Sequence, residues 1–364
     1  MRLKKGILLS GVLFTASMLF ACGNGKSAES TVAPSQKESE KSTEKAEEKS
    51  SGAKKLKIVT TNFPSYDFAR AITKGDAELT MLVKPGAETH SYEPSPKDII
   101  TIQNADLFLY TGGDSDEWVE DVLKSVQGKN LHVFKMMDAV SLMEEETVEG
   151  MQEEEEDDHD HGKEGQDKDD SAKDDSAKDD HDQDKEDEPE MDEHVWTSPK
   201  NAITIVEKLE ETISGLDTEH KEEFKANSDA YVKELEELDK SFQEVVDHGK
   251  RKEIIVADRF PFAYFCKEFG LKYFAAFPGC STDTQPSAST IAFLTDKVKE
   301  DQIPVVFHIE MSNEDMVDAI CRDTGAKKML LNAVHNVTDS DFKAGKTYVD
   351  LMKPNVEALK EPLN

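Results

Sequence analysis

The sequence predicts an α/β protein with two lobes, each a parallel β-sheet covered by helices, joined by a long rigid helix. Strand and helix patterns alternate before residue 144, and the same alternation returns after residue 250. Alternation of this kind is typical of parallel sheets, because a parallel strand pair needs a long crossover that a helix supplies. Between the two regions, residues 220–248 contain no glycine or proline and carry an apolar stripe at helical spacing.

Short runs rich in apolar and β-branched residues mark the expected strands. They are Leu56–Thr61, Glu78–Val83, Leu107–Thr111 and Leu131–Val133 in the first lobe, and Ile254–Ala257, Leu271–Phe277, Pro304–Ile309 and Lys328–Asn332 in the second. The expected helices are Tyr66–Ile72, Pro96–Asn104, Glu117–Val126, Pro261–Phe269, Ser287–Glu300, Asn313–Thr324 and a C-terminal helix over 348–356.

The lobes and their connection have predicted boundaries. We expect a first lobe over 55–198, a helical connection over 199–249 and a second lobe over 250–364. The second helix of the connection, over 220–248, would extend about 40 Å at about 1.5 Å per residue. A helix of that length between two lobes would act as a stiff strut.

The N-terminal residues have the pattern of an export signal. Basic residues at positions 2, 4 and 5 precede the apolar run Ile7–Ala21, which is short for a membrane-spanning helix. The run ends in Leu-Phe-Ala-Cys, which resembles the lipobox of bacterial lipoproteins. We therefore expect residues 1–22 to form a lipoprotein signal that is cut before Cys22, with lipidation of that cysteine. An ordinary secretory signal is the alternative. Residues 23–54 have almost nothing to bury and predict a disordered tether.

The charge is strongly negative and unevenly distributed. The chain has 44 basic and 77 acidic residues, a formal net charge of −33, which argues against binding to nucleic acid or to an anionic membrane surface. Residues 144–193 alone hold 27 acidic and 5 basic residues, with His159, His161 and His181 among them. This block predicts a disordered insert, which is either a solubilising loop or a loop that captures metal weakly.

Four polar residues stand where an α/β protein places its ligands. His90 follows an expected strand and precedes a helix, and His194 directly precedes the helical connection. Glu310 ends one strand of the second lobe, and His335 follows the last strand. Loops at the carboxyl ends of parallel strands are common ligand sites, although each histidine taken alone would also fit a hydrogen-bonded structural residue.

Several motifs give these residues a recognisable setting. The chain resembles the solute-binding proteins of zinc and manganese ABC importers, known as cluster A-I or cluster 9. The resemblance is carried by Pro85–Pro96 (PGAETHSYEPSP), Ala105-Asp106-Leu107, Trp118, His194–Pro199 (HVWTSP) and the C-terminal run Tyr348 to Val356. It implies two (β/α)₄ lobes joined by one rigid helix, with the metal between them.

The resemblance also implies a ligand set. His90 and His194 match the first two family histidines, and Glu310 matches a carboxylate at the end of a strand in the second lobe. Arg259 stands where many zinc-binding members have a histidine, and arginine stays protonated and cannot ligate. His335 is the expected replacement, which gives a shell of three nitrogens and one oxygen that suits Zn²⁺ better than the harder Mn²⁺.

The remaining candidates have supporting roles. We expect Arg259 to hold Glu310 or Asp258, and we keep His308, two residues from Glu310, as a reserve ligand. Because an exported protein can form disulfides, we expect a bond between Cys280 and Cys321, with separate buried thiols at these positions and at Cys266 as the alternative.

The sequence therefore predicts a non-enzymatic, extracytoplasmic zinc-binding protein that captures Zn²⁺ between its lobes and delivers it to an ABC importer permease. We expect a monomer anchored by lipid to the outer face of the bacterial cytoplasmic membrane. The alternatives are a manganese-binding importer subunit, an exported zinc metallohydrolase and a metal-buffering adhesin. The sequence has no HExxH, GxSxG or Gly-rich phosphate loop, which counts against the hydrolase.

Overall fold

Two four-stranded parallel sheets form the frame of the protein. The structure, a computed structural model, describes residues 55–126, 130–152, 189–281 and 285–364. The first sheet contains β1 (Leu56–Thr60), β2 (Ala77–Met81), β3 (Leu107–Tyr110) and β4 (His132–Lys135) in the order β2-β1-β3-β4. The second contains β5 (Glu253–Phe260), β6 (Lys272–Pro278), β7 (Val305–His308) and β8 (Lys327–Leu330) in the order β6-β5-β7-β8. The two sheets thus repeat one topology, and the predicted two-lobe α/β fold is confirmed.

Helices cover both sheets, and three of the six begin at a side-chain cap. The first lobe has α1 (Phe63–Thr73), α2 (Pro96–Gln103) and α3 (Trp118–Ser125), and the second has α6 (Ala263–Phe269), α7 (Ala288–Glu300) and α8 (Asp315–Thr324). Ser95 and Asp98 form a capping box at the start of α2, directly after the loop that carries His90. This cap fixes where the loop ends and the helix begins.

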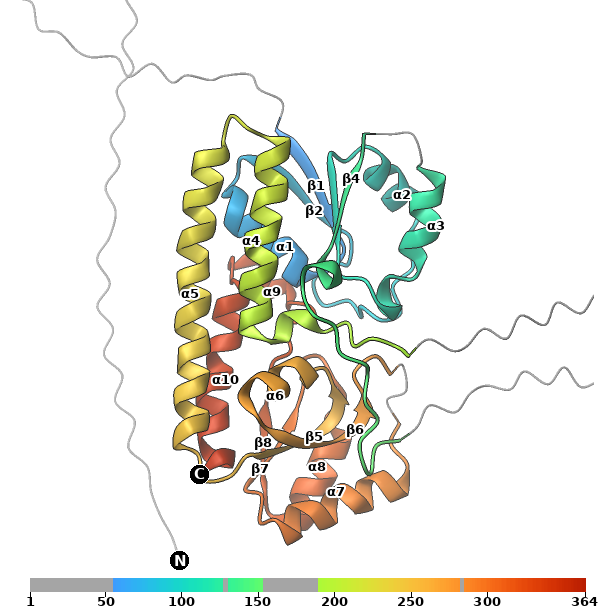
Figure 1. Ribbon diagram of the computed structural model, residues 1–364. Helices are drawn as coiled ribbons and strands as arrows, with labels where there is room; N and C mark the ends of the chain where they lie inside the picture. Colours follow the sequence, from blue (N-terminus) through green and yellow to red (C-terminus); the bar gives the residue numbers. More distant parts are fainter. Residues whose placement is uncertain (1–54, 127–129, 153–188, 282–284) are drawn as a thin grey trace, which may run out of the picture. The chain divides into compact units, whose positions relative to one another are not determined.

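The connection between the lobes is a helical hairpin. α4 (Pro199–Leu216) and α5 (Lys221–His248) lie side by side. α5 runs past both lobes, α4 lies beside the first lobe, and α10 (Tyr348–Leu363) lies beside α5 (Figure 1). α5 has 28 residues and is therefore about 42 Å long. Its buried residues recur every three, four or seven positions: Phe224, Ser228, Tyr231, Leu235, Leu238, Phe242 and Val246. The predicted strut is present, and its apolar stripe packs against α4 and α10.

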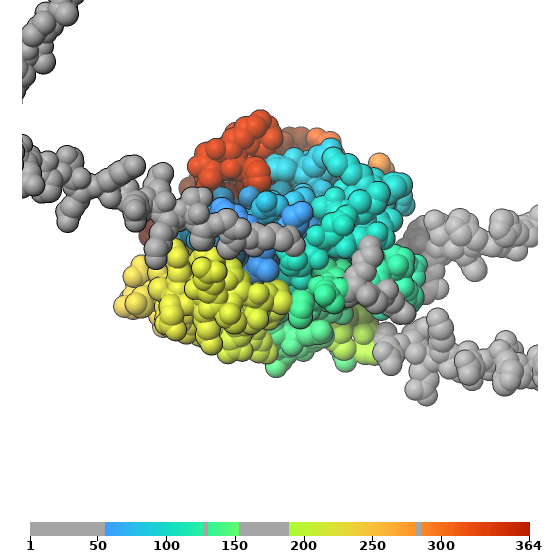
Figure 2. Space-filling view, turned by 90° about the horizontal axis from the view of Figure 1, so that it is seen from above, coloured from blue at the N-terminus to red at the C-terminus, as the bar shows by residue number. Residues whose placement is uncertain are grey.

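The C-terminal segment returns to the first lobe. Figure 2 shows part of this segment, in red, directly against the blue and cyan residues of the first lobe. The Arg70 guanidinium donates to the carbonyl of Lys346 at 2.7 Å. The buried carboxylate of Asp67 accepts from the backbone N–H of Tyr348 at 2.6 Å and from the hydroxyl of Tyr231 at 2.8 Å. One carboxylate of α1 therefore joins α5 and α10 to the first lobe.

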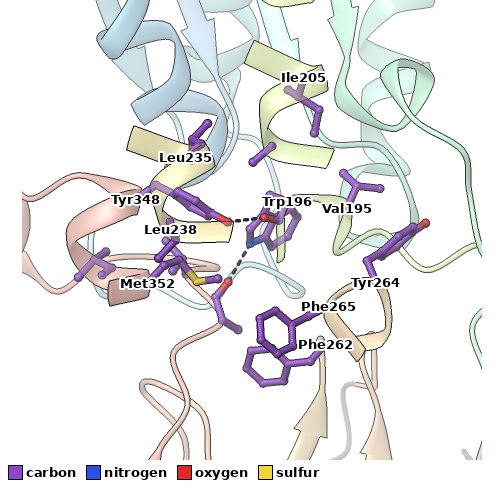
Figure 3. Close-up of a cluster of buried hydrophobic side chains, with 14 of the residues drawn as sticks. Val195, Trp196, Ile205, Leu235, Leu238, Phe262, Tyr264, Phe265, Tyr348 and Met352 are labelled. Atoms are coloured by element: carbon purple, nitrogen blue, oxygen red, sulfur yellow. Dashed lines mark hydrogen bonds between the residues drawn. The ribbon is translucent and has the colours of Figure 1, made fainter. Parts of the chain in front are cut away.

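A single apolar core continues from one lobe to the other around Trp196 (Figure 3). The indole is 1% exposed, and its Nε1–H donates to the carbonyl of Ala333 in the second lobe at 2.8 Å. The hydroxyl of Tyr348 donates to the carbonyl of Trp196 at 2.6 Å. Phe262 and Phe265 of the second lobe and Ile205 of α4 line the same cluster. The lobes are thus held by shared packing as well as by the connecting helices.

The ends of the acidic segment belong to the folded part of the chain. Glu144 and Met191 form an antiparallel bridge, and the N–H of Gln152 donates to the carbonyl of Ala276 at 2.9 Å. The carboxylate of Glu145 accepts from the N–H of Cys280 at 2.9 Å. The disorder that we expected over 144–193 therefore does not extend to 144–152 or 189–193, which pack on the second lobe.

Several predictions fall on residues outside the described ranges. They concern the signal at 1–22 with Cys22, the tether at 23–54, and His159, His161 and His181. Within the described ranges, no helix has both the length and the apolar composition needed to cross a bilayer.

We predict that Trp196→Phe destabilises the protein by about 2–4 kcal/mol, because it leaves a cavity and an unpartnered buried carbonyl at Ala333. Tyr348→Phe, which removes only one hydroxyl, should cost about 1 kcal/mol. Urea unfolding followed by circular dichroism measures both free energies of unfolding. A Trp196→Phe effect below that of Tyr348→Phe would contradict the bridging role of the indole.

Candidate metal centre

Three histidine rings from distant parts of the chain meet between the lobes. His90 lies in the loop between β2 and α2, His194 precedes the short 3₁₀ helix Val195–Thr197, and His335 follows β8. The ring centroids are 4.7 Å apart for His194 and His335, 5.3 Å for His90 and His335, and 5.7 Å for His90 and His194. One ring nitrogen of each residue lies within 4.8 Å of the others. The structure thus brings together three of the four predicted ligands.

The Nε2 atoms of these rings have no hydrogen-bond partner in the described part of the chain, although all three are buried. Buried polar atoms are normally hydrogen-bonded, and an unpartnered one costs free energy. Three such atoms in one place therefore form a binding site for a group that accepts several lone pairs at once. A divalent metal ion is that kind of partner.

The Nδ1 atoms, in contrast, all face acceptors. Nδ1 of His194 lies 3.1 Å from a carboxylate oxygen of Asp192. Nδ1 of His90 lies 2.8 Å from the hydroxyl of Ser115, which donates to Glu193 at 2.5 Å. Nδ1 of His335 lies 3.5 Å from a carboxylate oxygen of Glu310. Acceptors on this side favour the tautomer that carries its proton on Nδ1 and leaves the Nε2 lone pair free, as metal-binding histidines require.

Glu310 lies at the site, but on the Nδ1 side of His335. Its two oxygens accept from the backbone N–H groups of Ala333 at 2.7 Å and His335 at 2.9 Å. Val334, between these donors, has a φ of 59°, a left-handed conformation that costs a β-branched residue free energy. A carboxylate bound by two amides can hold such a loop. These contacts are those of a group that positions the loop and the ring of His335, and the ligand role that we expected for Glu310 stays a prediction.

Arg259 also differs from expectation. Its guanidinium contacts the carboxylate of Glu88 at 3.3 and 3.4 Å, across the boundary between the lobes. We expected it to hold Glu310 or Asp258, but the carboxylate of Asp258 accepts from the backbone N–H of Arg259 and not from its side chain. Glu88 lies two residues before His90, so this ion pair sits beside the histidine cluster.

The cysteine prediction was wrong, because Cys266, Cys280 and Cys321 are all free thiols. Cys321 lies on α8 against the outer core of the second lobe, whereas Cys280 follows β6 and lies near Glu193 and His194. His308 is outside the histidine cluster, and its Nδ1 lies 3.0 Å from the carbonyl of Ile309.

Burial and neighbouring charges together set the pKa values of the three rings. Burial and the charges of neighbouring cationic groups lower the pKa of His90 to about 2 and lower the pKa of His335 well below its usual range. Burial also opposes the charged form of His194, but the charge and hydrogen bond of Asp192 outweigh it, so the pKa of His194 is raised. Burial raises the pKa values of Glu193 and Glu310 to about 7. Two of the rings are thus neutral and able to ligate well below neutral pH.

Sequence reasoning missed the residues behind the rings. Asp192 and Glu193 directly precede His194, but they could not be told apart from the acidic residues before them. Ser115 gave no signal at all, because a lone serine in a loop is common. Only Glu88 could have been found from the sequence, because its position two residues before His90 puts a carboxylate near that ring.

Comparisons with known proteins found zinc-binding and zinc-uptake proteins. A protein family described as ZnuA, zinc-uptake complex component A, periplasmic, matches residues 58–362. The zinc-binding lipoprotein AdcA of Streptococcus pneumoniae R6 is 33% identical over 84% of this chain, which spans 56% of the length of AdcA. The high-affinity zinc uptake system protein ZnuA of Bacillus subtilis 168 is 33% identical over 85% of this chain and 88% of its own length.

Solved structures show the same fold. The Zn(II)-bound ZnuA-like domain of Streptococcus pneumoniae AdcA superposes with a TM-score of 0.66 at 29% identity, over 85% of this chain and 99% of that one. The metal-dependent lipoprotein YcdH of Bacillus subtilis gives a TM-score of 0.66 at 30% identity, over 85% of this chain and 100% of that one.

We predict that cation affinity falls with decreasing pH by about tenfold per pH unit below the pKa of His194, because one bound proton must be displaced. Asp192→Asn removes the charge that raises this pKa, so the fall should begin at a lower pH. The carboxyl groups of Glu193 and Glu310 titrate in the wild type and in the variant alike. The difference between the two pH curves therefore reports on His194. Zinc competition titrations from pH 5 to 8 measure it.

The matched control is Asp217→Asn, because Asp217 raises the pKa of the remote His220 in the same way. That variant should follow the wild-type curve throughout. An Asp192→Asn curve with the wild-type onset would contradict the role assigned to Asp192.

Proposed function

The chain belongs to the ZnuA family of periplasmic zinc-uptake components, and from this premise we propose that it is the extracytoplasmic zinc-binding protein of an ABC importer. The observation that carries the proposal is the convergence of three buried, unpartnered Nε2 atoms between two lobes. A site of this kind can take up a cation from outside and release it when the lobes or loops move. The cation is therefore the cargo of the protein.

The ligand chemistry favours zinc. We assign His90, His194 and His335 as the ligands, all through Nε2. Neutral imidazoles suit Zn²⁺, whereas Mn²⁺ is the harder ion and prefers a shell rich in oxygen. Asp192, Glu193 and Glu310 lie behind the rings, on the Nδ1 side, and orient them without direct ligation, which supports the same choice.

The proposal includes the cellular setting. We infer that the mature chain is exported and held at the outer face of the cytoplasmic membrane by a lipid on Cys22, and that it delivers Zn²⁺ to a membrane permease as a monomer. The support is the lipobox-like run before Cys22 and the name of the related AdcA, which is a lipoprotein.

A metallohydrolase needs separate consideration, because three histidines also form the shell of some catalytic zinc ions. The four-ligand shell expected from the sequence would leave no position for a catalytic water, whereas three side chains converge in the described residues. Family membership still favours a carrier over a catalyst. Absence of hydrolytic activity in the zinc-loaded protein is the corresponding expectation.

We predict that His90→Ala, His194→Ala and His335→Ala each weaken zinc binding by several orders of magnitude, because each removes one metal bond. Glu310→Gln should weaken it by about 10- to 100-fold, the usual effect of losing a group that orients a ligand. Competition with a chromogenic zinc chelator measures the affinities. His308→Ala is the matched control and should bind zinc as wild type does.

Two outcomes would contradict this assignment. Wild-type affinity in His335→Ala would remove His335 from the shell. A loss in Glu310→Gln as large as that in the histidine variants would make Glu310 a ligand.

We also predict that deleting residues 153–188 leaves the tight site intact but removes weaker zinc binding. The deletion spares 144–152 and 189–193, which pack on the second lobe. Replacing His159, His161 and His181 together by asparagine is the matched control for charge, because it keeps every carboxylate. Calorimetric zinc stoichiometry at low and high salt tests the prediction, and an unchanged stoichiometry would reduce the segment to a solubilising loop.

A further inference from the structure

A cavity of about 170 Å³ adjoins the histidine cluster. Its lining includes His335 and Glu310 from the second lobe, Arg259 from the end of β5, and Gly86 and Glu88 from the loop that carries His90. The cavity is large enough for a small molecule of a few heavy atoms. It therefore offers space beside the ring of His335 that side chains do not fill.

Arg259 brings an incompletely paired charge to this cavity. Its side chain is 10% exposed, and its Nε–H has no partner among the residues that the structure describes. Its other nitrogens reach Glu88 only at 3.3 and 3.4 Å. Glu88 is a weak partner, because its side chain is 48% exposed and the same Oε1 also faces the N–H groups of Thr89 and His90.

Arg259 lines the same cavity as His335, and its charge helps to lower the pKa values of His90 and His335, so it would also act on a cation held by the three rings. Two positive groups repel each other strongly in a partly buried site, unless an anion lies between them. In addition, Zn²⁺ prefers four ligands, and the three histidines leave one position for a further donor. Both requirements, charge and coordination number, are met by one anion with two oxygens.

We propose that the cavity is an anion subsite, in which a small carboxylate-class anion binds together with Zn²⁺. One oxygen completes the shell of the metal, and the other accepts from the Nε–H of Arg259, a geometry to which guanidinium is suited. The cargo is then a zinc–carboxylate pair and not the bare ion. This inference rests on the proposed function and adds the chemical class of a second ligand.

The test is the zinc affinity of the full-length protein at increasing acetate concentration, at constant ionic strength and expressed per free zinc ion. If acetate and zinc bind together, the apparent zinc affinity rises with acetate and approaches a tenfold gain per tenfold increase. Bicarbonate in a parallel series distinguishes an organic carboxylate from inorganic carbonate.

Arg259→Gln removes the charge and should abolish the acetate dependence. Without acetate this variant should bind zinc at least as tightly as wild type, because a repelling charge is gone, and a merely structural role of Arg259 would not produce that gain. Arg259→Lys keeps the charge and controls for a folding defect in Arg259→Gln. It should retain only part of the acetate dependence. Arg322→Gln, at an exposed position on α8, is the matched control and should behave as wild type.

The outcomes separate this proposal from the one on which it rests. A wild-type protein that binds one zinc with no response to acetate or bicarbonate overturns the anion subsite and leaves the carrier function intact. A protein that binds no zinc at all overturns both. If Glu88→Gln loses tight zinc binding in the absence of added anions, Glu88 is the fourth ligand and the subsite is overturned. If that variant keeps both the zinc and the acetate response, the subsite is supported.

Discussion

The hydrogen bond from the Trp196 indole to the carbonyl of Ala333 is the contact on which the site depends. Trp196 lies two residues after His194, and Ala333 lies two residues before His335. One buried bond of 2.8 Å thus joins the segments that carry two histidines from different lobes, and their rings form the shortest ring pair of the cluster at 4.7 Å. Because protein cores pack densely, the large indole leaves little freedom for either segment to shift. The third ring, that of His90, is positioned by its own loop, which ends at the Ser95 cap of α2.

Most of the fold was predictable, because strand and helix periodicities are local and strong in this sequence. The errors occur where local signals mislead. The C-terminal helix was expected to end near Val356, yet it continues to Leu363 with Pro354 and Pro362 inside it. The short helix α9 (Asp339–Lys343) was missed, because none of its residues is buried and it has no apolar stripe. α1 begins at Phe63, three residues before its predicted start, with Pro64 in the first turn, where proline is well tolerated.

The site was predictable in its members but not in its geometry. The histidines stand out because each lies in a loop at the end of a strand or before a helix. A sequence does not tell on which side of a ring a carboxylate will lie, so the ligand role expected of Glu310 stays a prediction. In the structure it contacts Nδ1 of His335 and two backbone amides. Cys280 and Cys321 were paired because export permits a disulfide, but both are free: Cys321 packs against a core cluster of the second lobe, whereas Cys280 lies near Glu193 and His194.

The centre is preorganised for a cation, since two rings are neutral, carboxylates stand behind all three, and three lone pairs converge. X-ray absorption spectroscopy at the zinc edge of the loaded protein tests this claim most directly. The account predicts three imidazole nitrogens at about 2.0–2.1 Å and one oxygen at a similar distance. A sulfur at about 2.3 Å, which Cys280 would supply, or fewer than three imidazoles would contradict it.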